Sequence, residues 1–317
     1  MTSRFHRPNL PTATALLAAS LGLAACDSPD LPAVQPPPPI AAPTPPPPET
    51  AASAALRTYF AEVQSSLLSQ GLLRTDGGGD DAPFTDRNLT ENFVRIALYE
   101  EYARGQVSTT RSETPIQLLR WDQPVRLSIL FGPSVSPAKQ AADRARIASY
   151  LARLSQVTGH PISVTDQNPN FWLHIASVDE RAALGPALSR ELSELTPGQI
   201  ASITTMNRDT FCQVLTQSNP TTSTYVRAVA VIPSEHPELL RLSCIHEELA
   251  QALGLPNDSN AARPSIFNDD EEFALLTAQD ELMLRILYNP ALRPGMTEAQ
   301  ARPLIQSLAS RLLNGES

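Results

Sequence analysis

The chain has 317 residues, a formal net charge of −9 at pH 7 and a hydrophobic content of 42%. This acidity argues against nucleic acid or an anionic bilayer surface as a partner. The residues after position 50 are enough for one large domain, or for a core with a small appendage.

The first 25 residues have the pattern of a secretory signal. A basic start is followed by a short apolar stretch at 13–25, and small residues precede Cys26. The apolar stretch is shorter than the roughly 20 residues that a membrane-spanning helix needs. The run LAAC at 23–26 resembles the lipobox of bacterial lipoproteins, which implies that residues 1–25 are removed and that Cys26 is lipidated. The alternatives are an ordinary secretory signal with an incidental cysteine, and an uncleaved anchor.

These features predict a protein of the bacterial cell envelope, anchored by its N-terminal lipid in the inner or the outer membrane and facing the periplasm. Residues 26–50 comprise the lipidated cysteine and a proline-rich tether. Proline favours an extended backbone without internal hydrogen bonds, so this segment is expected to be a semi-rigid spacer. A linker is favoured over a docking site for a proline-binding domain.

Residues 51–110 are expected to form an N-terminal helical segment. Apolar residues at three- and four-residue spacing predict one helix over 51–73 and a second over 86–104. The glycine- and aspartate-rich run at 75–81 separates the two helices.

Residues 111–317 are expected to form one α+β domain. The residue patterns predict strands at 125–132, 162–166 and 171–176, a helix from 136 to 157, a helix at 178–194, and a final pair of strands at 211–216 and 223–233. Closing helices are expected at 237–253, which Gly254 would end, at 277–288 and at 297–313.

With Cys26 lipidated, Cys212 and Cys244 are the remaining cysteines. Two cysteines in an oxidising compartment favour a disulfide between them. Closing a loop of this length would contribute about 3 to 4 kcal/mol to stability.

The candidate functional motif begins at Cys244, in the run CIHEELAQALGLPND. His246 and Glu247 start an HExxH zinc-protease pattern, but position 250 is Ala where a second His is needed. Shifted by one residue, EELAQALGL at 247–255 resembles the zinc-binding helix of matrixins, within the metzincin proteases.

This resemblance covers roughly residues 125–290 and implies a zincin-like mixed sheet with a long helix, a motif helix and C-terminal helices. Glu247 and Gln251 stand where the first two zinc-binding histidines stand, and Glu248 stands at the general base. Asn257 falls at the third ligand position, with Asp258 beside it.

Two segments downstream extend the resemblance. Ser265, Ile266 and Phe267 resemble the turn beneath the metal, with Phe in place of Met. Residues 276–288 resemble the closing helix, with Asp280 as one of the best anchors.

The chain is also similar to a proteobacterial lipoprotein family known as domain of unknown function 2927. Its hallmark of a cysteine followed by EE, Q, LGL and ND is matched from Cys244 to Asp258. That resemblance implies no established activity. It implies that the oxygen-bearing side chains are a property of the family.

Metzincins bind zinc through three neutral imidazoles, whereas the side chains at these positions offer oxygen. Oxygen ligands suit Ca²⁺, Mg²⁺ or Mn²⁺ better than zinc, and those ions activate bound water less. Zinc proteolysis is therefore not expected. Three interpretations remain, namely solvated side chains with local hydrogen bonds, a binding groove without metal, and a divalent metal site held by Glu247, Gln251 and Asp258 or Asn257.

Other polar residues carry weaker signals. His246 lies about 100° around the helix from Glu247, so a surface or packing role is expected. His174 lies in a strand and is expected to be packed and hydrogen-bonded. The acidic run at 268–272 lacks the spacing of an EF-hand and is expected to be a solvated loop.

The sequence therefore predicts a lipid-anchored periplasmic protein with a degenerate zincin-like domain. The favoured interpretation is a non-catalytic domain, without a cofactor, that binds a protein or peptide of the envelope. The alternative is an atypical metal-dependent hydrolase, with Glu248 as general base and a divalent metal as cofactor.

Overall fold

The computed structural model describes residues 48–100 and 114–315. The predicted signal, Cys26 and most of the tether lie outside these residues, as do positions 101–104 of the second predicted helix. No helix in the described ranges is long and apolar enough to cross a membrane.

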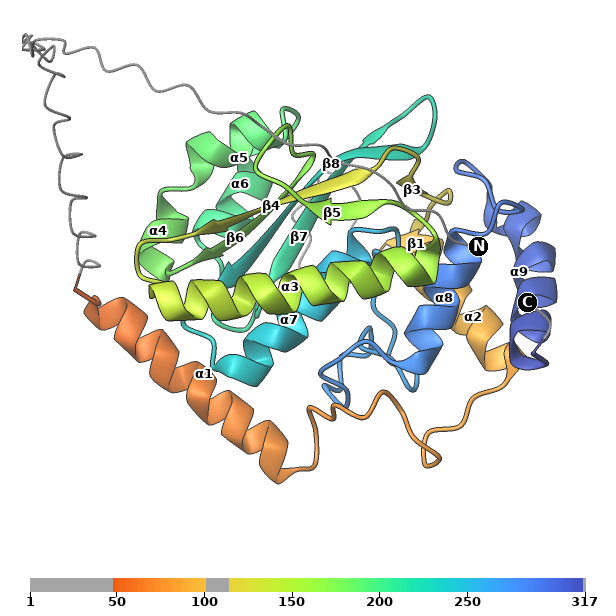
Figure 1. The fold of residues 1–317 in the computed structure, drawn as a ribbon, viewed down its shortest axis with the longest axis horizontal. Coiled ribbons are helices and arrows are strands. Elements are labelled where there is room, and N and C mark those ends of the chain that lie inside the picture. The colour runs from red at the N-terminus through yellow and green to blue at the C-terminus, as the bar shows by residue number, and fades with distance from the viewer. Residues whose placement is uncertain (1–47, 101–113, 316–317) are drawn as a thin grey trace, which may run out of the picture. The chain divides into compact units, whose positions relative to one another are not determined.

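A six-stranded mixed sheet is the centre of the fold (Figure 1). Its strands are β3 (Arg120–Trp121), β4 (Val125–Phe131), β5 (Ile162–Val164), β6 (Phe171–Ala176), β7 (Gln213–Asn219) and β8 (Thr224–Pro233). The strand order is β3-β8-β6-β4-β5, and β7 also pairs with β8. The α+β fold class predicted from the sequence is confirmed.

The strands along this order run parallel to one another, and β7 pairs antiparallel with β8. The predicted final pair of strands is therefore a hairpin. Two short strands, β1 (Tyr99–Glu100) and β2 (Thr114–Pro115), form a separate antiparallel pair that the sequence did not indicate.

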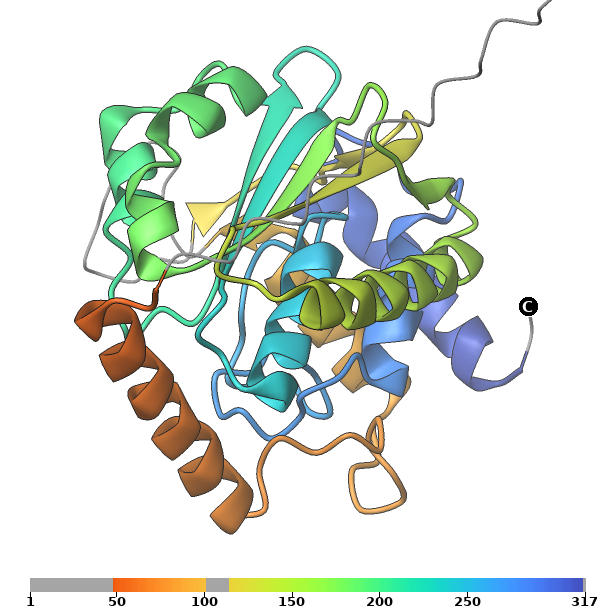
Figure 2. The same cartoon turned by 60° about the vertical axis from the view of Figure 1, so that its left-hand side comes forward.

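Alternate residues of β8 enter two different apolar cores, because successive side chains of a strand point to opposite faces. Ala228, Ala230 and Ile232 join the larger core, which includes residues of α3 (Pro137–Thr158) and α7 (Glu238–Gln251). Val229 and Val231 join a smaller core with α5 (Gly185–Glu191) and α6 (Pro197–Thr204). Figure 2 shows these two groups of helices on opposite sides of the sheet.

Side-chain caps define the ends of several helices. Ser136 accepts a hydrogen bond from the backbone N–H of Lys139 at the start of α3, and Gly159 ends that helix at a φ of 66°. Thr277 and Asp280 form a reciprocal capping box at the start of α8 (Ala278–Leu287). These are the helix boundaries that the sequence indicates most clearly.

The N-terminal segment packs on the same body. α1 (Ala51–Ser69) begins at the cap residue Thr50 and lies against α7. α2 (Asp86–Ala97) packs against α8 and α9 (Glu298–Leu313). Between them, the backbone of Leu73 and Arg74 bonds to Glu271 and Glu272.

The predicted helix at 178–194 is wrong as a single element. The chain forms α4 (Val178–Ala182) and then α5, which begins at Gly185 with Pro186 in its first turn. Proline lacks the N–H that a continuing helix requires, so the helix restarts there. The residue patterns also did not predict α6.

The predicted disulfide between Cys212 and Cys244 is confirmed. It joins the segment before β7 to the middle of α7, with 5.9 Å between the two Cα atoms. The bond therefore holds the motif helix to the edge of the sheet.

Candidate functional site

The motif helix α7 positions the acidic residues. Its N-terminus has no side-chain cap of its own, and Gln64 of α1 accepts a hydrogen bond from the backbone N–H of Leu240 instead. The helix is largely buried, but Glu247 and Gln251 are partly exposed one turn apart. Glu248 is only 3% exposed. The polar side chains thus emerge at the end of an otherwise buried helix.

Glu247, Glu248 and Cys212 converge at one point. One carboxylate oxygen of each glutamate and the Sγ of Cys212 all lie within 4.8 Å of one another. One oxygen of the buried Glu248 carboxyl, Oε2, has no hydrogen-bond partner in the described structure. Because Cys212 is bonded to Cys244, its sulfur is not a free thiolate here.

Burial sets the protonation of this cluster. Desolvation raises the pKa of Glu247 well above its usual range, and the charges of Asp258 and Glu248 raise it further. Desolvation also raises the pKa of Glu248, followed by the charge of Asp258. Several carboxylates cannot all ionise together in such a site without a compensating cation. The cluster therefore has to hold protons or a positive charge.

The structure brings Gln251 and Asp258 into the same region. The Gln251 amide nitrogen donates a hydrogen bond of 3.0 Å to an Asp258 carboxylate oxygen. Asn257 is directed elsewhere, since its side-chain nitrogen donates to the backbone carbonyl of Arg95 at the end of α2. Its own backbone N–H donates to the carbonyl of Ile96. Asn257 therefore anchors α2 to the motif segment.

A three-imidazole zinc site does not fit these residues. Glu247 and Gln251 offer oxygens, and the side-chain amide of Gln251 is engaged with Asp258. The third position in the pattern, Asn257, is 2% exposed and bonded to α2. Glu247, Gln251 and Asn257 together therefore do not form a site for a zinc-bound water.

The turn at Ser265 and Phe267 is rigidly held. The Ser265 hydroxyl donates to Asp280 at 2.6 Å and accepts from the backbone N–H of Phe267 at 3.0 Å. The carbonyl of Phe267 accepts from the N–H of Ser259, the residue after Asp258. This turn links the closing helix α8 to the chain segment beside the acidic cluster.

Asp280 is the centre of that linkage. Its carboxyl accepts hydrogen bonds from Ser265, Ile266 and Thr277. Complete burial raises its pKa to about 6, although these hydrogen bonds act in the opposite direction. Its role is to join the turn to the start of α8.

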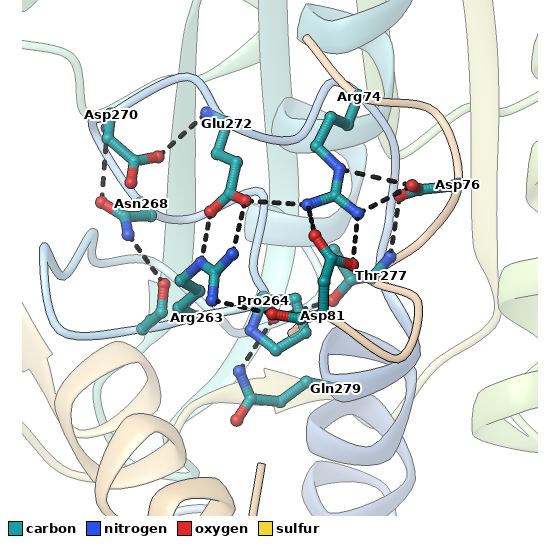
Figure 3. Close-up of polar contacts among 12 residues, drawn as sticks. Arg74, Asp76, Asp81, Arg263, Pro264, Asn268, Asp270, Glu272, Thr277 and Gln279 are labelled. Atoms are coloured by element: carbon teal, nitrogen blue, oxygen red, sulfur yellow. Dashed lines mark hydrogen bonds and ion pairs between the residues drawn. The ribbon is translucent and has the colours of Figure 1, made fainter. Parts of the chain in front are cut away.

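A partly exposed ion-pair network holds the loop next to the cluster (Figure 3). Arg74 pairs with Asp76, Asp81 and Glu272 at 2.7 to 3.0 Å. Glu272 also pairs with Arg263 at 2.6 Å. The hydrogen bonds of Arg74 with Asp76 and Asp81 raise the pKa of Arg74 and lower the pKa of both aspartates. The network therefore ties residues 74–81 to the loop at 263–272.

The acidic run at 268–272 is only partly the solvated loop expected from the sequence. Asp269 and Asp270 are exposed, but Glu271 is partly buried and its φ is positive at 57°. Burial, with the charges of Asp269 and Asp270, raises the pKa of Glu271 to about 7. The pairing of the next residue, Glu272, with Arg74 was not predictable, since contacts across 198 residues leave no local pattern.

His246 and His174 have packing roles. The His246 ring stacks on Tyr150, with 3.8 Å between ring centroids, and its Nδ1 accepts from the N–H of Leu276. Burial lowers the pKa of His246 to about 3. His174 pairs with Glu191 at 2.8 Å. Neither histidine is among the residues that converge at Glu247.

Sequence reasoning missed a further buried polar group next to the disulfide. His236 is fully buried, and its Nδ1 lies 3.9 Å from the Sγ of Cys244. The ring packs edge-on against Phe60 of α1, with 4.2 Å between centroids. An isolated histidine before a helix gives no sequence signal for such a position.

Comparison with known proteins gives one family. A family model described as "Protein of unknown function (DUF2927)" matches residues 86–307. No curated protein and no solved structure matches the chain. The matched residues include α7, both cysteines of the disulfide and the turn at Ser265, whereas α1 and the ion-paired residues 74–81 precede the match.

Proposed function

The chain belongs to the DUF2927 family of proteins of unknown function, and from this premise we propose that it is a lipid-anchored envelope protein whose zincin-like domain binds a protein or peptide without cleaving it. One observation carries the proposal. The positions that the matrixin resemblance assigns to zinc-binding histidines hold Glu247 and Gln251, and the third, Asn257, is bonded to α2. A domain that has the helix and turn around these positions but lacks the imidazoles does not have the zinc site that activates water in matrixins at neutral pH.

The fold supports the zincin-like part of the proposal. A long helix, α3, follows the first long strand of the sheet, and the motif helix α7 follows the hairpin of β7 and β8. Gly254 lies just after α7, and the turn at Ser265 lies before the closing helix α8. This order is the one that the resemblance implies.

The candidate binding region is rich in carboxyl groups. The charges of Asp258, Asp269 and Glu271 all act on Glu247, so these four carboxyl groups form one region. Complementary charge favours a partner segment that carries Lys or Arg at this region.

Photocrosslinking in intact cells tests partner binding. A photoreactive residue at the exposed position 269, beside the acidic region, should give a discrete protein or peptide adduct. The matched control is the exposed position 166, which follows β5 and has no part in the acidic region. Absence of an adduct specific to position 269, or equal adducts from both positions, would contradict partner binding at this region.

The lipid anchor rests on the sequence of residues 1–26. Mass spectrometry of the N-terminal peptide from purified membranes should find an acylated Cys26 as its first residue. A mature N-terminus upstream of Cys26, or an unmodified Cys26, would contradict the anchor.

One observation favours a second candidate function, an atypical metal-dependent hydrolase with Glu248 as general base. The Oε2 of Glu248 is buried without a partner in the described structure, as a group intended for a ligand or a proton would be. Elemental analysis after loading with Mn²⁺ or Ca²⁺ tests this candidate. A stoichiometric ion that is lost in Glu247→Ala would favour the hydrolase, and no retained ion would exclude it.

A further inference from the structure

The disulfide lies beside the acidic cluster, so its oxidation state changes the atoms that the cluster can offer to a metal ion. The Sγ of Cys212 and one oxygen each of Glu247 and Glu248 lie within 4.8 Å of one another. One sulfur and two oxygens around a tetrahedral zinc ion are about 3.3 to 3.5 Å apart, given bonds of about 2.0 Å to oxygen and 2.3 Å to sulfur. A contraction of at most about 1.5 Å would therefore bring these three atoms into one coordination sphere.

A second observation points to a missing ligand. Glu248 is 3% exposed, and its Oε2 has no hydrogen-bond partner among the described residues. A buried carboxyl oxygen without a partner is costly, so such atoms usually have a ligand or ion in one functional state. Because Glu248 shares this cluster with Cys212, the same ion could contact both side chains.

The disulfide determines which ion the cluster can hold. While Cys212 is bonded to Cys244, the cluster offers only oxygen, which suits hard cations. A free Cys212 thiolate would add the soft ligand that zinc prefers. We propose that reduction of the Cys212–Cys244 disulfide by a dithiol creates a zinc site made of Cys212, Glu247 and Glu248, with water in the fourth position. This inference does not rest on the proposed function.

Reduction of the disulfide and binding of zinc are two separate steps. The dithiol supplies two electrons and two protons and becomes a disulfide itself, while the bond between Cys212 and Cys244 is replaced by two thiols. Zinc then displaces the proton of the Cys212 thiol and the protons held by Glu247 and Glu248, binds both glutamates as carboxylates, and the displaced protons pass to solvent. Exchange with a disulfide in the reverse direction re-forms the Cys212–Cys244 bond and reduces that disulfide to a dithiol, which removes the sulfur ligand and releases the ion.

The surroundings of the two sulfurs favour reduction by attack of a thiolate on Cys212. Cys212 is partly exposed, whereas Cys244 is 2% exposed, so an incoming thiolate has access to the Cys212 sulfur. Attack there releases Cys244 as the leaving thiol. The Nδ1 of His236 lies 3.9 Å from the Cys244 sulfur and can accept its S–H. The buried thiol therefore has a partner, and Cys212 remains free for the metal.

Two single substitutions separate this zinc site from a general effect of losing the disulfide. Both Cys244→Ser and Cys212→Ser break the bond, but only Cys244→Ser leaves a free Cys212 thiol beside the two glutamates. Zinc affinity of the full-length protein in detergent would be measured by competition with a chromophoric chelator. Cys244→Ser should bind one zinc ion without reductant. Cys212→Ser should bind it more weakly by at least the roughly 10- to 100-fold that loss of a group hydrogen-bonded to a metal ligand costs, because Cys212 is itself a ligand.

The wild-type chain provides an independent measurement if the variants fold poorly. It should bind zinc only after reduction with a phosphine, and cobalt in place of zinc should give a thiolate-to-metal charge-transfer band. Glu248→Gln in the Cys244→Ser background should weaken binding. Equal zinc affinity of Cys244→Ser and Cys212→Ser, or equal affinity of the wild type before and after reduction, would overturn the proposal.

Discussion

His236 illustrates how a single buried side chain can control stability. Burial, together with the charges of Arg241 and Arg181, lowers its pKa to about 3. Its Nε2 has no partner in the described structure, so protonation there would place an uncompensated charge beside Phe60. In the unfolded chain, the same ring takes up a proton near pH 6.5.

We predict that His236→Phe flattens the acid limb of the stability curve. As pH falls from about 6.5 to about 3, the unfolded wild type binds a proton that the folded state refuses, so its free energy of unfolding decreases. The difference between variant and wild type should shift in favour of the variant by about 1.4 kcal/mol per pH unit. Chemical denaturation at several pH values measures this shift, and parallel curves for the two proteins would contradict it.

At the same scale, sequence spacing predicted part of the candidate site. Helix geometry alone placed Glu247 and Gln251 one turn apart, and the resemblance to the motif added Glu248 and Asp258. The approach of Cys212 to the glutamates was not recognised, although the predicted disulfide ties Cys212 to Cys244, which lies three and four residues before Glu247 and Glu248 on one helix face. The spacing also did not show that Asn257 turns towards α2, because a ligand position in a motif carries no information about competing hydrogen-bond partners.

Among the elements, the end of the motif helix is the most constrained. Gly254 has a φ of 126°, and a Cβ at this position would lie 2.3 Å from the carbonyl oxygen of Leu119. The residue therefore has to be glycine both for its backbone conformation and for the contact with the segment before β3. The sequence indicated the helix stop but not the contact.

We expect Gly254→Ala to destabilise the fold by at least about 2 kcal/mol, because conformational strain and a backbone clash add together. Gly71→Ala is the matched control. Gly71 also has a positive φ, of 79°, but a Cβ added there would meet no described atom within 4 Å, so its cost should be about 1 kcal/mol. Thermal or denaturant unfolding compares the two variants, and equal losses would show that the contact with Leu119 does not matter.

The ion-pair network of Arg74 joins the segment before α2 to the loop beside the acidic cluster. In Arg74→Met, the pairs with Asp76, Asp81 and Glu272 are lost. Amide hydrogen exchange should then become faster at Ala274, whose N–H donates to the carbonyl of Arg74. Arg57→Met, which removes only the exposed pair with Glu49, is the control and should leave Ala274 unchanged. Equal exchange in both variants would indicate that the backbone pairing alone holds the loop.

Elements with strong local signals were predicted more accurately than those set by tertiary packing. The alternating strands and the capped helix α3 were recognised, because their periodicity and end residues are local. The split at Gly185 and Pro186 was missed, although proline is a local signal for a helix start. The short strands β1, β2 and β3 contain two residues each, too few for a periodicity to be visible.

For the whole molecule, membrane attachment is expected to depend on one residue. No helix in the described ranges could span a bilayer, and the proposed anchor is the lipid on Cys26. Cys26→Ser should shift the protein from the membrane to the soluble fraction, or leave it as an uncleaved precursor. Fractionation with immunodetection distinguishes these forms from the wild type. A mature, membrane-bound Cys26→Ser protein would contradict lipid anchoring.

We expect that the oxygen-bearing side chains at 247 and 251 leave the oxidised domain without zinc-dependent proteolysis. The most direct measurement is cleavage of a mixed peptide library by the disulfide-intact protein loaded with zinc, beside its Glu248→Gln variant, with zinc content determined in both. We predict no retained zinc at these positions and no difference in peptide products. Stoichiometric zinc that is lost in Glu247→Ala, with cleavage that disappears in Glu248→Gln, would contradict the claim.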